Sequence, residues 1–186
     1  MRWLPIWRTD PNKLQAEGKR DKHMAIRYCT KEWLEESARL YAASDHFQDV
    51  LKKVTAKLFY RITAEPGWGI DEDFLFGAEV KEGKLVDMGF CSDAEAKERA
   101  DFILGATPQV WKGILRKDKK FISEFMMGKI KLEQGSRVEL LKITPYANHF
   151  VDALTQFEIL YPDEMSSEEL ETYRADLSEF RKHAGL

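Results

Sequence analysis

The chain has 186 residues and a formal net charge of −3, with 44% hydrophobic and 33% charged residues. This length and apolar content predict one globular domain rather than a disordered chain, and the slightly acidic balance argues against nucleic acid as a partner, because phosphate binding needs a basic surface. No run of about 18 apolar residues is present, and residues 1–10 lack the apolar run of a signal peptide, so we expect a cytoplasmic protein.

The N-terminal part of the chain is predicted to be an arm followed by a helix. Trp3 and Trp7 lie in a charged stretch without periodicity. Thr30 is a helix-capping residue, and apolar residues from Trp33 to Leu40 follow it at helical spacing. The pattern therefore predicts a helix that begins after Thr30.

A second short helix and a first strand are predicted next. Asp45 and Gln48 have the spacing of a capping box, which predicts a helix from Asp45. From Leu58 the apolar period changes to two, which is typical of a strand, and Pro66 ends the pattern. Two helices are thus expected to precede the sheet.

The clearest hairpin in the sequence lies between residues 74 and 90. Residues 74–80 and 85–90 each alternate, and Glu82 with Gly83 supplies the positive φ angles of a tight turn. Because side chains alternate between the two faces of a strand, we expect Val86 to face the same apolar side as Val80. The hairpin predicts one strongly apolar sheet face.

The second half of the chain is predicted to contain two further strands and two short helices. Residues 100–106 predict a fourth strand, and Thr107 with the following proline predicts the start of a helix. Gly128 is placed to end a second helix in the left-handed conformation. Residues 129–133 then predict a final short strand.

The last 50 residues are predicted to be helical. Ser136 and Glu139 form a capping-box pattern before an apolar helix, and Pro145 forces a kink or a restart. This segment is a candidate lid over the sheet. Ser167 is predicted to cap a final helix that Gly185 ends.

Two segments, 100–115 and 125–136, resemble the C-terminal half of sterol carrier protein 2 domains. In that family a strand feeds a helix, a second short helix ends in a Gly-Lys-Ile or Gly-Lys-Leu strand, and an apolar C-terminal helix follows. The residues in matching places are Asp101, Gly128, Lys129, Ile130 and Leu132. The resemblance implies an α+β fold, with a largely antiparallel twisted sheet of about five strands covered on one face by helices.

The order of elements extends the resemblance over residues 45–157. We therefore expect an N-terminal arm and helix (1–44), a lipid-binding domain like sterol carrier protein 2 (45–157), and a C-terminal helical extension packed on the same domain (158–186). Without a Pro- or Ser-rich linker, the extension is expected to belong to the same unit.

The resemblance implies an apolar tunnel, which in relatives takes fatty acids, acyl-CoA esters or sterols. The second half of the chain also carries more large, adaptable apolar side chains than two short helices need. The residues predicted to line the cavity are Phe76, Met88, Phe102, Trp111, Ile114, Leu115, Phe121, Phe125, Met126, Leu140, Ile143, Phe150 and Leu154. From the residues alone, the alternative is that these side chains fill a solid core.

A basic cluster lies at one predicted turn between two helices. Its members are Lys112, Arg116, Lys117, Lys119 and Lys120. The functional hypothesis is contact with an anionic headgroup or a transient contact with an anionic membrane surface, at about 1 kcal/mol per basic residue near that surface. The alternative is an ordinary solvated loop.

Catalytic and metal-binding patterns do not emerge from the sequence. Asp71 and Asp73 begin an acidic turn that lacks the later ligands of a calcium loop, and the four histidines are dispersed without a metalloprotease or nucleophile motif. We therefore predict a carrier of a small apolar ligand that is not an enzyme, with no metal and no cofactor.

Two other functions remain open from the sequence. One is a protein-interaction or oligomerisation module with a filled core, for instance a homodimer formed through the arm or the last helix. The other is a ligand-presenting accessory of a lipid-metabolising enzyme.

Overall fold

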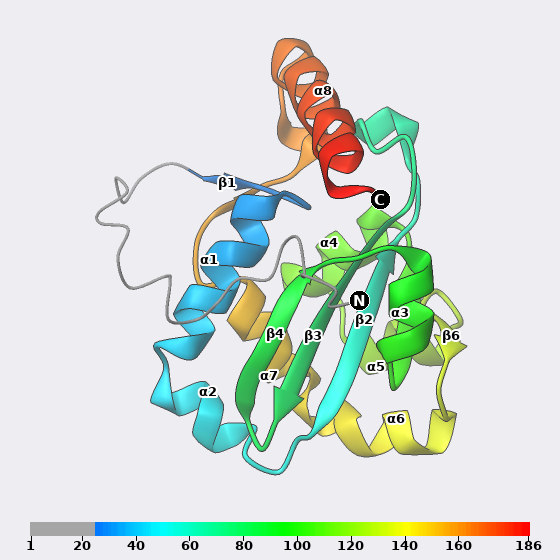
Figure 1. Cartoon of the computed structure of the whole chain (residues 1–186). Coiled ribbons are helices and arrows are strands. Elements are labelled where there is room, and N and C mark those ends of the chain that lie inside the picture. Colours follow the sequence, from blue (N-terminus) through cyan, green and yellow to red (C-terminus); the bar gives the residue numbers. More distant parts are fainter. Residues whose placement is uncertain (1–24) are drawn as a thin grey trace, which may run out of the picture.

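The computed structural model describes residues 25–186 as two sheets surrounded by helices (Figure 1). The predicted arm with Trp3 and Trp7 lies outside the described residues. The strands are β1 (Ile26–Arg27), β2 (Ala56–Ile62), β3 (Phe74–Lys81), β4 (Lys84–Phe90), β5 (Phe102–Ala106), β6 (Lys131–Gln134) and β7 (Ile159–Leu160). The α-helices are α1 (Lys31–Ala42), α2 (Asp45–Val50), α3 (Asp93–Arg99), α4 (Pro108–Leu115), α5 (Phe121–Met126), α6 (Arg137–Ile143), α7 (Ala147–Leu154) and α8 (Ser167–Ala184). Three 3₁₀ turns are η1 (Pro66–Trp68), η2 (Thr144–Tyr146) and η3 (Pro162–Glu164).

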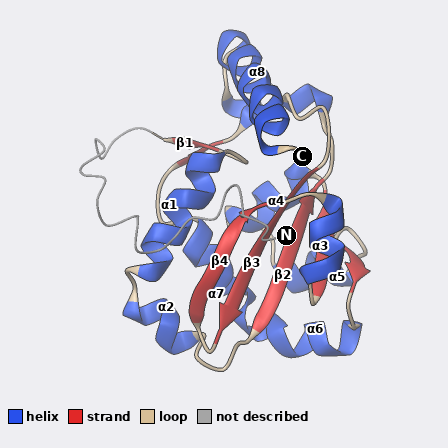
Figure 2. Cartoon of the chain, in the orientation of Figure 1, coloured by secondary structure: helices blue, strands red, loops and turns tan. Residues whose placement is uncertain are grey.

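The main sheet has the strand order β4-β3-β2-β5-β6. Neighbouring strands run antiparallel except for β2 and β5, which are parallel. Figure 2 shows the helices gathered around this sheet, with α4 and α7 behind it. The predicted α+β fold with a five-stranded, largely antiparallel sheet is confirmed.

The hairpin between β3 and β4 has the predicted turn. Glu82 and Gly83 have φ angles of 50° and 76°. A bulge near the end of β3 pairs Val80 with Leu85, so the strands shift by one residue there. The inward position predicted for Val86 is therefore wrong, and 49% of this side chain's surface is exposed.

Gly83 meets the backbone of α2, which leads to a stability prediction. A Cβ added at Gly83 would lie 2.3 Å from the carbonyl oxygen of Gln48, whereas one at Gly128, with φ of +75°, meets nothing within 4 Å. Gly128→Ala is expected to cost only the positive-φ strain, about 1 kcal/mol. Gly83→Ala adds a backbone clash of about 1–3 kcal/mol, so urea denaturation should show the larger loss of unfolding free energy for Gly83→Ala. Equal losses of unfolding free energy in the two variants would contradict the close contact of Gly83 with the backbone of α2.

The helix caps follow the predicted chemistry, with two shifts of one residue. Thr30 caps α1 as predicted, because its hydroxyl accepts the backbone N–H of Trp33. The caps predicted at Asp45 and Ser167 are wrong. Ser44 and Ser166 occupy those positions, since each has extended backbone and accepts an N–H three residues later.

Helix α3 covers the face of the sheet opposite to α4 and α7 (Figure 1). The polar stretch that forms it was not predicted to be helical, although Ser92 and Glu95 make a complete capping box. Phe59 and Ile103 are buried beside Ala96 in a small separate core on this face. Helices therefore contact both faces, while most of them lie on one.

Helix α8 packs beside the short β1–β7 sheet, at the end of the molecule away from α6 (Figure 1). The Tyr173 hydroxyl donates to the carbonyl oxygen of Tyr28 at 2.8 Å, and the rings of Phe180 and Phe90 lie 5.3 Å apart. The last helix thus covers the core from outside. Within residues 25–186, neither α8 nor any other helix has the length and apolar content that a membrane span needs.

Candidate functional site

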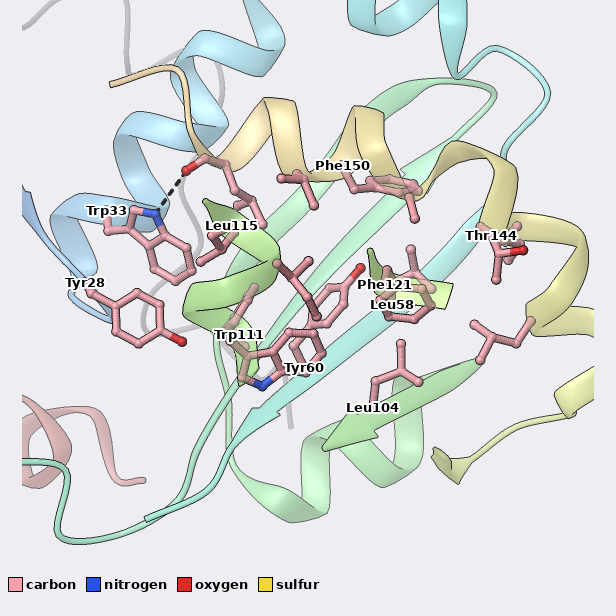
Figure 3. Close-up of a pocket in the computed structure, with 17 residues that line it drawn as sticks. Tyr28, Trp33, Leu58, Tyr60, Leu104, Trp111, Leu115, Phe121, Thr144 and Phe150 are labelled. Carbon is pink, nitrogen blue, oxygen red and sulfur yellow. Dashed lines mark hydrogen bonds between the residues drawn. The ribbon is translucent and has the colours of Figure 1, made fainter. Parts of the chain in front are cut away.

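An apolar cavity lies between the main sheet and the helices behind it (Figure 3). The space open to the centre of a water-sized sphere is about 60 Å³. The lining residues on the sheet are Leu58, Tyr60, Phe76 and Leu104. The other lining residues are Tyr28, Trp33, Trp111, Ile114, Leu115, Phe121, Leu140, Ile143, Thr144, Ala147, Phe150, Val151 and Leu154. The cavity is thus built from the core-facing sides of β2, β3, β5, α1 and α4 to α7.

The periodicity of each element explains why these side chains converge. Alternation along β2 turns Leu58 and Tyr60 to the same sheet face. Helical spacing places Trp111 and Ile114 on one side of α4, which faces the sheet. Phe150 on α7 closes the cavity from the opposite side.

The two sides of the cavity differ in how well they are covered. Leu58 and Leu104 on the sheet are almost fully buried. Ile143 and Phe150 on the helices are only half-buried, and Leu140 is the one fully buried residue of α6. The cavity is therefore least protected from solvent on the side of α6 and α7.

The two indole N–H groups of the cavity wall are used within the protein. The Trp33 indole donates to the carbonyl oxygen of Leu154 at 3.2 Å, which ties α1 to the end of α7 (Figure 3). The Trp111 indole donates to the carbonyl oxygen of Arg61 at 2.9 Å. Both rings are thereby fixed and present their apolar faces to the cavity.

The remaining polar groups of the lining are three hydroxyls. Thr144 donates its hydroxyl to the carbonyl oxygen of Leu141 at 2.8 Å. Burial raises the pKa of Tyr28 and of Tyr60 above their usual value, so both phenols stay neutral. Within residues 25–186, the lining has no acidic, basic or histidine side chain, and this composition suits an apolar ligand with few polar groups.

The cavity brings together nine of the thirteen residues predicted to line it. Those nine are Phe76, Trp111, Ile114, Leu115, Phe121, Leu140, Ile143, Phe150 and Leu154. The four that lie elsewhere are Met88, Phe102, Phe125 and Met126. The sequence therefore indicated most of the helix side of the cavity.

The four residues outside the lining are placed elsewhere by local packing. Met88 lies on the edge strand β4 and borders a smaller gap beside α1 and α8. Phe102 packs against the backbone of Gly135. Phe125 lies beneath an arginine side chain from the start of α6, and 60% of the surface of Met126 is exposed.

Eight lining residues were not among the predicted ones. They are Tyr28, Trp33, Leu58, Tyr60, Leu104, Thr144, Ala147 and Val151. The strand alternation predicts that Leu58 and Tyr60 share one sheet face, and this signal was sufficient to include both in the predicted lining. Tyr28 and Trp33 reach the cavity only through contacts with distant parts of the chain, for which the sequence holds no local signal.

The predicted basic cluster is largely paired with acidic side chains. Lys112 Nζ lies 2.7 Å from Asp163 and 2.9 Å from Glu164, and Arg116 also contacts Glu164. The other pairs are Lys117 with Asp152 at 2.5 Å and Lys119 with Glu124 at 3.9 Å. Lys120 has no ion pair among residues 25–186. The headgroup role of this cluster stays a prediction, with much of its charge already compensated.

Solved structures share this architecture. A conserved hypothetical protein from Thermus thermophilus, named as a candidate sterol carrier protein, superposes with a TM-score of 0.63 at 16% identity, over 75% of this chain and 95% of that chain. A crystal structure of sterol carrier protein 2 superposes with a TM-score of 0.57 at 16% identity, over 68% of this chain and 95% of that chain. No family model and no curated protein matches the sequence. The chain therefore contains a domain with the fold of sterol carrier protein 2.

Proposed function

We propose that this chain binds and carries a lipid-like apolar ligand in the cavity between the main sheet and α4 to α7. The observation that supports the proposal is the cavity itself, with its apolar lining on a fold shared with sterol carrier protein 2. A fatty acid, an acyl-CoA or a sterol-like molecule fits this chemistry. The activity is noncovalent binding, and no lining residue is assigned a catalytic role.

The driving force is burial of the ligand's apolar surface, at about 0.8 kcal/mol per CH₂ group. The free space of about 60 Å³ holds only a few water-sized spheres, so a long-chain ligand requires side chains or helices to move. The half-buried residues of α6 and α7, such as Ile143 and Phe150, are the ones that move at least cost. We propose that this segment is the lid.

The first test of the carrier function is the cargo of the purified protein. Native mass spectrometry before and after solvent extraction should detect a copurified lipid, and the delipidated protein should bind a fluorescent fatty acid saturably. The proposal would be contradicted if no lipid copurified and the delipidated protein showed no saturable binding.

We also propose that α5 and α6 contact an anionic membrane when ligand is loaded or released. We define the α5–α6 surface by the four most exposed apolar side chains of this region, namely Met126, Met127, Val138 and Leu141. Exposed apolar side chains of this kind mark interaction sites. The same two helices also line the cavity through other side chains, Phe121 and Leu140.

The charge around the α5–α6 surface supports an anionic partner. Residues 116–142 contain eight basic and four acidic residues, whereas the whole chain has a net charge of −3. Two of the eight, Arg116 and Lys117, pair with acidic residues outside this range, which leaves six basic against four acidic residues. The Arg137 guanidinium lies 3.6 Å from the sulfur of Met126, which places positive charge beside the apolar side chains. A surface with apolar contacts and nearby cations binds anionic lipid headgroups.

Vesicle binding tests the α5–α6 surface. The double variant Met126→Asp with Val138→Asp is expected to bind vesicles of anionic phosphatidylserine at least tenfold more weakly, because it removes apolar contact and adds negative charge. Val86→Asp, which changes an exposed residue of β4, should bind like the wild type. Liposome flotation at low and high salt gives the measurement. Unchanged vesicle binding by the double variant would contradict the proposal. So would light scattering that shows a dimer for the wild type and a monomer for the double variant, because the α5–α6 surface would then be a dimer interface.

A further inference from the structure

The hydroxyl of Tyr60 is a polar group held deep in an apolar cavity. Tyr60 lies on β2, the central strand of the main sheet. Its ring stacks on Phe76 with 5.2 Å between centroids and meets the edge of Trp111 at 5.6 Å. Figure 3 shows the hydroxyl pointing into the middle of the cavity. The ring contacts on both sides fix this direction.

Within the part of the chain that the structure describes, the Tyr60 hydroxyl has unused hydrogen-bonding capacity. Among residues 25–186, no side chain or backbone group is within hydrogen-bonding geometry of it, whereas the indoles of Trp33 and Trp111 and the hydroxyl of Thr144 all donate to carbonyl oxygens. Tyr60 is half-buried although its neighbours on the sheet are almost fully buried. Tyr28, the other phenol of the lining, has no exposed surface. Tyr60 is therefore the phenol that a ligand can reach.

The surroundings of Tyr60 favour an uncharged partner. No cationic side chain lines the cavity within residues 25–186, and the one lysine of α4, Lys112, is held by Asp163 and Glu164. A buried carboxylate without a cation pays a large desolvation penalty. Burial also raises the pKa of Tyr60, so the phenol keeps its proton and remains a neutral donor.

We propose that Tyr60 selects ligands whose apolar body carries an uncharged hydrogen-bonding group, a hydroxyl or a carbonyl, at the depth of β2. The ligand oxygen accepts a hydrogen bond from the Tyr60 hydroxyl, which keeps its proton. Ligands with an ionised carboxylate bind with that group outside the cavity and gain nothing from Tyr60. This inference rests on the proposed carrier function and narrows its ligand class.

The test compares three ligands of equal chain length: dodecan-1-ol, dodecane and dodecanoate. Each displaces a fluorescent fatty acid from the delipidated full-length protein at neutral pH. Tyr60→Phe is expected to weaken the binding of dodecanol about tenfold, because the ligand hydroxyl loses its hydrogen-bond partner in an apolar site. Its affinities for dodecane and dodecanoate should stay within about twofold of the wild type.

Tyr146→Phe is the matched control. Tyr146 lies in η2 beside the cavity but is not part of its lining, so this variant should leave all three affinities unchanged. An equal loss for all three ligands in Tyr60→Phe, or no loss for dodecanol, would overturn the selection by Tyr60 while leaving the carrier function standing. Failure of all three ligands to bind the wild type would overturn the carrier function itself, and the inference with it.

Discussion

Ala147→Trp is expected to weaken ligand binding at least tenfold while the protein stays folded. Ala147 is the first residue of α7 and faces the cavity. An indole at this position points into a cavity that holds only a few water-sized spheres, so it occupies volume that the ligand would take. Titration of the delipidated variant with a fluorescent fatty acid should show affinity at least tenfold below that of the wild type.

The control for this variant is the next residue of the same helix. Asn148 is exposed and does not line the cavity, so Asn148→Trp should bind the probe like the wild type. Overpacking by Ala147→Trp costs about 1–3 kcal/mol of stability, which circular dichroism and thermal melting will detect. Wild-type affinity in the folded Ala147→Trp variant would show that the ligand binds elsewhere.

Trp33→Ala is expected to cause the largest loss of stability among the variants considered. Trp33 is 1% exposed, its ring meets Phe76 edge-on at 5.4 Å, and its indole N–H donates to the carbonyl oxygen of Leu154. Removing a buried Trp costs about 3–5 kcal/mol, a large share of the roughly 5–15 kcal/mol that stabilises a typical domain. Urea denaturation should therefore show a much lower midpoint.

Two further variants separate the contributions of Trp33. Trp33→Phe retains a ring and loses the hydrogen bond, so it should recover most of the stability and remain about 1 kcal/mol below the wild type. Leu40→Ala removes a half-buried residue of the same helix that is not packed against the core and should cost under about 1 kcal/mol. Similar losses of unfolding free energy for Leu40→Ala and Trp33→Ala would show that Trp33 does not make the large contribution to stability predicted for it.

The features that the sequence predicts well depend on local chemistry. Glu82 and Gly83 form the expected turn because the positive φ angles they need are rare for other residue pairs. Gly128 ends α5 with φ of 75° for the same reason. The capping positions of α1 and α6 follow from side chains that bond to the backbone three residues away.

The elements that escaped prediction lack a strong apolar pattern. Helix α3 buries only Ala96, so its capping box was the one sequence signal for a helix. Strands β1 and β7 have two residues each and pair across most of the chain, Ile26 with Ile159. No local pattern encodes such a pair, because it depends on how the whole core packs.

The sequence identifies apolar residues more readily than the direction in which each one points. Phe121 and Met126 both belong to α5 and were both predicted to line the cavity. They are five residues apart, so their side chains differ in direction by about 140° around the helix axis. Phe121 faces the cavity and Met126 faces solvent. In such a short helix, the orientation depends on tertiary contacts that the apolar pattern does not contain.

The pairing of β1 with β7 also determines when the chain completes its core during synthesis. Tyr28 follows β1 directly and bonds through its backbone to Leu160 and Tyr173, near the other end of the chain. A ribosome releases the chain from its N-terminal side, so Tyr28 emerges more than 130 residues before Leu160 and Tyr173, with which it bonds. The end of the cavity that Tyr28 lines can therefore form only after Leu160 and Tyr173 have emerged, and the nascent chain exposes this apolar surface until then.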